Sequence, residues 1–145
     1  MLIESRPGLD PELAALVTAQ QREMRTAEQT FRPSDDAAYL VAVVQGRAVA
    51  CAGWQPLPDG TAELKRLYVR PAFRGRGIAR QLIVAIEEEV LAEDRGLLRL
   101  ETDAFLPAAI ALYQSSGYHE IPAFGEYAGN DYSICFEKRL AALVL

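Results

Sequence analysis

The chain has 145 residues, of which 50% are hydrophobic and 24% are charged, a length and composition typical of one globular domain. Its net charge of −5 argues against nucleic acid as the main partner. No apolar run approaches the roughly 18–20 residues that cross a bilayer, and an acid and a proline interrupt the start where a signal peptide would be apolar. We therefore expect a cytoplasmic protein without a membrane partner.

The first third of the chain predicts a strand, a helix and a β-hairpin. Residues 2–4 can form a short strand. A helix is expected to begin at Asp10-Pro11, where an acidic N-cap precedes a proline at the first helical position, and to run to about Gln29. Two apolar runs, 39–44 and 48–54, are joined by a short polar turn and predict the hairpin.

The remaining elements follow a turn at Asp59-Gly60, after which residues 62–69 predict a strand. Apolar residues then recur every fourth position from Ile78 to Val90, which indicates a helix that could end near Gly96. A strand is expected at 97–101 and a helix at 107–116. Two further strands are expected at 118–121 and 131–139. Because there is no repeat, low-complexity tract or linker, we expect one α+β domain spanning residues 1–145.

The central part of the chain concentrates positive charge. Residues 64–86 contain no acidic side chain, although the protein as a whole is acidic. The cations in this stretch are Lys65, Arg66, Arg70, Arg74, Arg76 and Arg80. Such a concentration favours a local anion site, although a solvated basic face is the alternative.

A strand-to-helix turn within this stretch favours the anion site. The first turn of a helix presents free backbone N–H groups and the positive end of its dipole, and Gly75 and Gly77 let that backbone approach a ligand closely. Phosphate is the natural ligand of such a turn. No Lys-Ser/Thr pair follows, which excludes a Walker loop, and Arg80 stands where a dinucleotide fingerprint needs its third glycine.

These residues carry a family resemblance. The segment 74–79, Arg-Gly-Arg-Gly-Ile-Ala, resembles the Arg/Gln-x-x-Gly-x-Gly/Ala signature of the GNAT superfamily, the Gcn5-related N-acetyltransferases. Residues 63–71, 109–113 with Gly117-Tyr118, and 133–138 resemble the central strand, a late helix-to-strand segment and the last strand of that family. The resemblance implies the GNAT acyl-CoA N-acyltransferase fold, an α+β (α/β) architecture with a mixed central sheet of about six or seven strands and about four flanking helices.

The resemblance also implies an activity and its cosubstrate. The protein would transfer an acetyl group from acetyl-CoA directly to a primary amine of a small molecule or peptide. Backbone groups of the central strand would hold the pantetheine arm, at Leu67, Tyr68 and Val69. Backbone amides of the turn would bind the pyrophosphate, at Arg74, Gly75, Arg76, Gly77, Ile78 and Ala79. The side chains of Arg74 and Arg76 would add fixed positive charge.

Two side chains are candidates for catalysis. Tyr113 aligns with the tyrosine that in many members of the family protonates the departing CoA thiolate, although it could instead be a core residue. Glu63 is the candidate base that takes the proton of the amine, although it could instead face solvent on its strand. A lone histidine, His119, and no Cys-His or Ser-His pairing argue against a nucleophilic triad, and no metal-ligand spacing is present.

The alternation of apolar residues along the central strand slips by one position. Ala62 and Leu64 are apolar on one parity, whereas Leu67 and Val69 are apolar on the other. A bulge can absorb such a slip. We therefore predict a β-bulge near residues 65–67, which resembles the distortion that separates the central strands of this family.

Several features stay open at the level of sequence. Many relatives have Asn or Gln before the late helix to bind the cofactor arm, whereas this chain has Leu106. The acceptor groove is expected at residues 24–39 and 123–132, with acids that suit a cationic amine at Glu28, Asp35, Asp36, Glu126 and Asp131. A non-catalytic acyl-CoA-binding module is the alternative function, a nicotinamide or flavin protein is a third, and a homodimer is possible. Cys51 and Cys135 are expected as buried thiols and Trp54 as a core residue.

Overall fold

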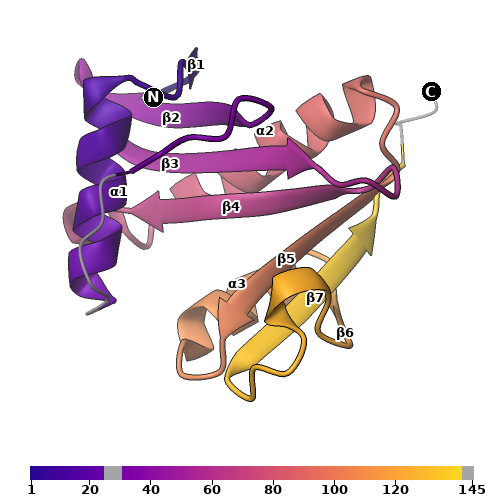
Figure 1. Ribbon diagram of the computed structural model, residues 1–145. Coiled ribbons are helices and arrows are strands. Elements are labelled where there is room, and N and C mark those ends of the chain that lie inside the picture. Colours follow the sequence, from indigo (N-terminus) through magenta and orange to yellow (C-terminus); the bar gives the residue numbers. More distant parts are fainter. Residues whose placement is uncertain (25–30, 142–145) are drawn as a thin grey trace.

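A computed structural model describes residues 1–24 and 31–141 of the chain, which form a seven-stranded mixed sheet with helices on both faces (Figure 1). The strands are β1 Leu2–Arg6, β2 Ala38–Val44, β3 Arg47–Pro56, β4 Ala62–Val69, β5 Leu97–Asp103, β6 His119–Ile121 and β7 Ser133–Arg139. The α-helices are α1 Pro11–Glu23, α2 Ile78–Ala92 and α3 Pro107–Ser115. Two short 3₁₀ helices are η1 Pro71–Phe73 and η2 Gly125–Tyr127.

The sheet is divided at its centre. Its strand order is β1-β2-β3-β4-β5-β7-β6, and β4 and β5 form its parallel pair. These two strands pair only through Ala62 with Leu98 and Glu63 with Arg99. Beyond Glu63 the strands diverge, and Figure 1 shows the V-shaped opening between them. The predicted mixed sheet is therefore confirmed, and it opens in the middle.

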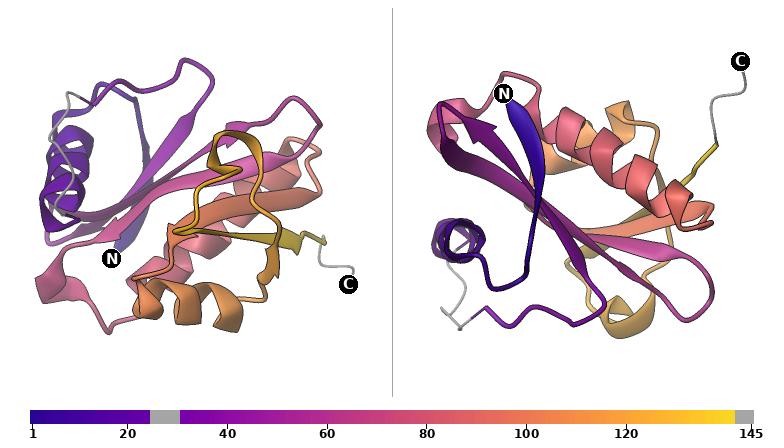
Figure 2. Two further views of the ribbon diagram at one scale, coloured as in Figure 1. Left: turned by 60° about the horizontal axis from the view of Figure 1, so that its bottom comes forward. Right: turned by 90° about the horizontal axis from the view of Figure 1, so that it is seen from above.

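The two long helices lie on opposite faces of the sheet (Figure 2). Along β2, Leu40 and Ala42 belong to the apolar cluster beneath α2, whereas Tyr39 and Val41 belong to the cluster beneath α1. This alternation follows from the pleat, which directs successive side chains to opposite faces. The four-residue periodicity of α2 predicted its buried face correctly. Three of its residues are completely buried: Leu82, Ile86 and Val90.

Helix ends differ from the prediction at two places. The Asp10 carboxylate accepts a hydrogen bond from Leu13 N, as an N-cap should, but α1 ends at Glu23. Met24 is 46% exposed, so the buried stripe that would stabilise a continuation is lost there, and positions 25–29 of the prediction lie outside the described residues. The second helix ends at Ala92 rather than near Gly96, because Asp94 adopts a left-handed conformation with φ of 59°.

The number of helices differs slightly from the prediction. The described residues contain three α-helices, whereas about four were expected. The segment between Phe31 and Ala37 forms no helix. The ring of Phe31 instead packs edge-on against the ring of Tyr39, with 5.6 Å between the ring centres.

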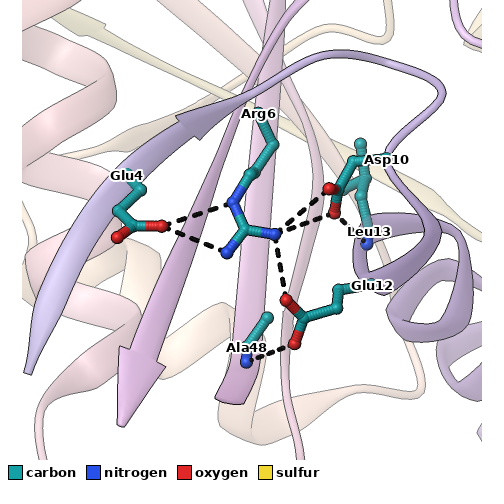
Figure 3. Close-up of polar contacts among 6 residues, drawn as sticks. All are labelled: Glu4, Arg6, Asp10, Glu12, Leu13 and Ala48. Carbon is teal, nitrogen blue, oxygen red and sulfur yellow. Dashed lines mark hydrogen bonds and ion pairs between the residues drawn. The ribbon is translucent and has the colours of Figure 1, made fainter. Parts of the chain in front are cut away.

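A cluster of charged side chains fastens β1 to the start of α1 (Figure 3). The guanidinium of Arg6 donates to Glu4 at 3.1 Å, to Asp10 at 3.1 Å and to Glu12 at 3.0 Å. The second oxygen of Glu12 accepts from Ala48 N at 2.8 Å, which ties the cluster to β3. That backbone hydrogen bond, followed by Arg6, holds the pKa of the Glu12 carboxyl below its ordinary value.

Replacing Arg6 by methionine is expected to lower Tm by roughly 2–5 °C at neutral pH, because three carboxylates then lose their shared cation. The pKa of Glu12 is depressed in the folded state, so this stabilisation is present at neutral pH and is lost as the pH falls. Thermal unfolding at several pH values measures the effect. Arg47→Met is the control, since Arg47 is exposed and forms no ion pair within residues 1–24 and 31–141. Equal Tm in Arg6→Met and wild type would contradict the assignment.

Candidate active site

The predicted bulge is present in β4. Cys51 of β3 pairs with Tyr68 and Gly53 pairs with Lys65, so two residue steps on β3 face three steps on β4. Arg66 has a φ of 58°, the left-handed conformation that accommodates the extra residue. Its carbonyl accepts a hydrogen bond from the Cys51 thiol at 3.2 Å, and burial raises the pKa of that thiol to about 12, which keeps the donor protonated.

A pocket of about 400 Å³ lies at the opening between β4 and β5. Its walls come from α1, β4, β5, α3 and the segment around η2. The residues that matter for chemistry there are Gln20, Glu63, Leu67, Glu101, Tyr113 and Tyr127. The two candidate catalytic residues, which are 50 positions apart in sequence, thus line the same pocket.

Glu63 is a buried carboxylate and not a solvent-facing strand residue. Only 4% of the residue is exposed, and burial raises the pKa of its carboxyl above the ordinary value of 4.5. A hydrogen bond from the Tyr127 hydroxyl, 2.6 Å from Oε2, opposes that shift. A carboxyl with a raised pKa in a pocket is suited to accept a proton.

Tyr113 has one end in the core and lines the pocket. Its ring lies 6.1 Å from Tyr118 and 6.3 Å from Phe136, and 7% of the residue is exposed. Within the described part of the chain its hydroxyl has no hydrogen-bond partner. Burial, followed by the charge of Glu101, raises the pKa of the phenol, so it keeps its proton at neutral pH. The core and catalytic interpretations of Tyr113 are therefore compatible.

The turn before α2 has the backbone conformation that its glycines predicted. Gly75 and Gly77 have φ of 77° and 78°, which side chains with a Cβ rarely adopt. Gly77 is the N-cap of α2, no side chain caps the helix, and its first turn has no acidic residue. A Cβ placed on either glycine would meet nothing within 4 Å, so the space beside the turn is open. Ile78 and Ala79 then form the first turn of α2.

The arginine side chains of the turn are engaged with the protein itself. Arg74 donates to Glu23 at 2.6 Å and to Val69 O at 2.9 Å, so its ion pair with α1 takes the place of the expected free phosphate contact. Arg76 lies 5.0 Å from the centre of the Phe73 ring. Their charge stays close to the turn, and the backbone amide of Arg74 donates to Pro71 O at 3.3 Å.

The expected arm-binding strand is also partly engaged. The carbonyl oxygens of Leu67 and Val69 accept from Gln20 Nε2 and Arg74 Nε, both at 2.9 Å. Gln20 lies on α1, and its amide lines the same pocket as Leu106. Its Oε1 is buried and has no partner within the described residues. The pocket lined by the leucine that departs from the family pattern thus also contains an amide, from another helix.

The expected acceptor acids only partly gather at the pocket. Glu126 lines it, whereas Asp35, Asp36 and Asp131 do not. Glu28 lies outside the described residues. Instead, Glu101 lines the pocket, where its carboxylate accepts from Ser133 Oγ at 2.6 Å. The acids that line this pocket therefore come from β4, β5 and η2, and they share it with Lys65 and Arg66.

The other residues singled out in the sequence lie away from this chemistry. Trp54 is in the core and donates to Glu89 at 3.1 Å. Cys51 and Cys135 are free thiols, and both are buried. His119 is exposed on β6. Within residues 1–24 and 31–141, no cluster of side chains could hold a metal ion and no helix is long and apolar enough to cross a membrane.

Known acetyltransferases are similar to this chain in sequence. A family model described as "Acetyltransferase (GNAT) family" matches residues 10–118. The chain is 33% identical over 133 residues to an IAA acetyltransferase of Azospirillum brasilense, covering 91% of this chain and 86% of that protein. It is 31% identical over 129 residues to the N-acetylaspartate synthetase of Rattus norvegicus, covering 88% of this chain but only 43% of that enzyme.

Solved structures of acyltransferases are similar to this chain in fold. A Klebsiella pneumoniae protein described as an acyl-CoA N-acyltransferase superposes with a TM-score of 0.87 at 33% identity, covering 97% of both chains. An aminoglycoside 6'-N-acetyltransferase complexed with coenzyme A shares the fold, with a TM-score of 0.76 at 18% identity over 99% of both chains. The matched family model, the relatives and the divided sheet together establish that this chain belongs to the acetyltransferase (GNAT) family and is an acyltransferase.

Proposed function

We propose that this chain transfers an acetyl group from acetyl-CoA directly to the primary amine of a small molecule or peptide. The observation that carries the proposal is the pocket at the β4–β5 opening. It brings a buried carboxyl and a protonated phenol to one cavity. A base and an acid in one cavity are what amine attack on a thioester needs, since one proton is removed and another is supplied.

The glycine turn fits the pyrophosphate of acetyl-CoA. It offers uncapped amides at a helix N-terminus, open space beside both glycines and no nearby acidic residue in the first turn of α2. The amides of residues 74–79 would hold the pyrophosphate, that of Arg74 after giving up its 3.3 Å hydrogen bond to Pro71 O, and the backbone of residues 67–69 would hold the arm. When bound, acetyl-CoA supplies the activated acyl group.

The side chains of the pocket would then handle protons. Glu63 removes a proton from the ammonium group of the acceptor, directly or through one water, because only a neutral amine can attack. Tyr113 gives the proton of its Oη to the departing thiolate, and the proton that the nitrogen loses after its attack restores the phenol. Four acids line the pocket, Glu63, Glu101, Asp103 and Glu126, against two cations, Lys65 and Arg66, and this excess of acids favours a cationic amine.

A thiol-release assay with a panel of amines tests the proposal. The panel includes aspartate, other amino acids, polyamines, an aminoglycoside and peptide N-termini. Release of CoA that depends on one of these amines, with the acetylated amine identified by mass spectrometry, is the expected result. Tight binding of acetyl-CoA without amine-dependent release across the panel would indicate a binding module instead.

Gly77→Val tests the phosphate turn. Valine disfavours a φ of 78°, so the turn shifts and its amides no longer converge on the pyrophosphate. Losing one charge-assisted hydrogen bond costs about 1.5–3 kcal/mol, which corresponds to CoA binding weakened about 10- to 100-fold. Arg74→Ala is expected to have a smaller effect, because Arg74 is paired with Glu23.

The control for Gly77→Val is Gly46→Val. Gly46 has nearly the same φ, 77°, and also has open space around its Cβ position, but it lies in the β2–β3 turn. Both variants carry comparable backbone strain, and only Gly77→Val is expected to lose affinity in calorimetric titration with CoA. Unchanged affinity for CoA in a folded Gly77→Val protein would show that this turn does not bind the pyrophosphate.

A further inference from the structure

The hydrogen bond between Tyr127 and Glu63 joins two segments that are far apart in the chain. The Tyr127 hydroxyl donates to Glu63 Oε2 at 2.6 Å across 64 positions of sequence. Tyr127 ends η2, the short orange turn below β4 in Figure 1, in the connection between β6 and β7. This connection therefore reaches the candidate base at the pocket, where both residues line the wall.

Tyr127 is held in place from both sides. Its ring packs edge-on against Phe124 at 5.4 Å, and the guanidinium of Arg99 lies 5.7 Å from the centre of the Phe124 ring. Further along, Tyr132 O accepts from Ala104 N at 2.8 Å, which anchors the connection to the end of β5. The phenol is thus placed by packing and by backbone hydrogen bonds, independently of the carboxylate that it contacts.

We propose that Tyr127 is a positioning residue that fixes the Glu63 carboxylate, occupying Oε2 so that Oε1 is left for the acceptor amine or a bridging water. The inference rests on the proposed function. A carboxylate free to rotate would present either oxygen to the pocket, whereas one pinned by a donor presents the same oxygen at every turnover.

The hydrogen bond also opposes the effect of burial on Glu63. Burial favours the protonated carboxyl, whereas a donor to its oxygen favours the carboxylate. The other charged or titratable groups around Glu63 are Lys65 and Arg66 on β4, Arg99, Glu101 and Asp103 on β5, Tyr113 on α3, Glu126 on η2 and Cys135 on β7. Lys65 favours the carboxylate, whereas Glu126 and Glu101 oppose it. Arg99 is already paired with Asp59 and Glu137. The Tyr127 hydroxyl is thus the hydrogen-bond donor that opposes the effect of burial on the pKa of Glu63, although burial is the larger effect.

Tyr127→Phe removes this donor and keeps the ring. Its effect is measured on the full chain by titrating the ¹³C carboxyl signal of Glu63, which is identified by its loss in Glu63→Gln. The pKa of Glu63 is expected to rise in Tyr127→Phe. The matched control is Tyr118→Phe, which removes another phenol–glutamate hydrogen bond, the 2.7 Å contact with Glu87, and should leave the titration of Glu63 unchanged. An equal or lower pKa of Glu63 in Tyr127→Phe would overturn the proposal.

A double-mutant cycle tests the consequence for catalysis, with an amine found in the thiol-release assay. Tyr127→Phe is expected to lower kcat/KM about tenfold at the acidic end of the pH profile, and a smaller loss should persist above the pKa of Glu63 because the carboxylate is no longer held in one orientation. In the Glu63→Gln background the same change should have almost no further effect, because Tyr127 acts through Glu63. Losses that simply multiply would show a separate role for Tyr127 and overturn the inference. If no amine is acetylated, the proposed function fails, and the titration of Glu63 still decides whether Tyr127 holds the carboxylate.

Discussion

Replacing Glu63 by glutamine is expected to lower kcat/KM for amine acetylation by about 10²–10⁴-fold near neutral pH, the usual contribution of a positioned base. Glutamine keeps the shape of the side chain but cannot take a proton from the acceptor. The wild-type rate should rise with pH through the pKa of Glu63, which lies above its ordinary value of 4.5. In Glu63→Gln this rise should be absent. Full activity in the variant would mean that another group serves as the base.

Stability separates this loss from a folding defect. Because the pKa of Glu63 is raised in the folded state, its carboxyl stabilises the fold most when protonated, and this contribution is lost as the pH rises through the folded pKa. Relative to wild type, Glu63→Gln should therefore gain stability as the pH increases, even though it loses activity. Glu120→Gln, an exposed change on β6, is the control and should alter neither quantity.

Replacing Tyr113 by phenylalanine is expected to lower kcat by about 10²–10⁴-fold, the usual contribution of a positioned acid. The affinity for acetyl-CoA should be almost unchanged, because the ring retains its packing against Tyr118 and Phe136. Burial raises the pKa of this phenol, so the wild-type hydroxyl should stay protonated throughout the neutral range. Single-turnover kinetics give the rate of the chemical step separately from binding and product release. Equal single-turnover rates in the two proteins would show that Tyr113 is not the acid and has only a structural role.

The sequence was most informative where a local pattern has a single structural solution. The phase slip between Leu64 and Leu67 predicted the bulge, and the structure has it with Arg66 in a left-handed conformation. The glycines at 75 and 77 predicted backbone with positive φ before a helix, and both have it. These features depend on neighbouring residues, so they can be found without knowledge of the tertiary structure.

Contacts between distant segments could not be predicted in the same way. Nothing near Tyr127 in the sequence indicates that it reaches Glu63, and nothing near Arg74 indicates that it pairs with Glu23 across 51 positions. Both contacts depend on how the elements pack around the divided sheet. For the same reason the acids around the pocket were predicted only in part, since Glu101 reaches it from the end of β5.

A crystal structure of the protein with bound acetyl-CoA tests the central claim most directly. The account predicts the pyrophosphate on the amides of residues 74–79 and the arm along β4 at residues 67–69. It also predicts the acetyl group at the β4–β5 opening, within reach of Glu63 and Tyr113. A pyrophosphate away from the amides of residues 74–79, or an acetyl group remote from Glu63 and Tyr113, would contradict it.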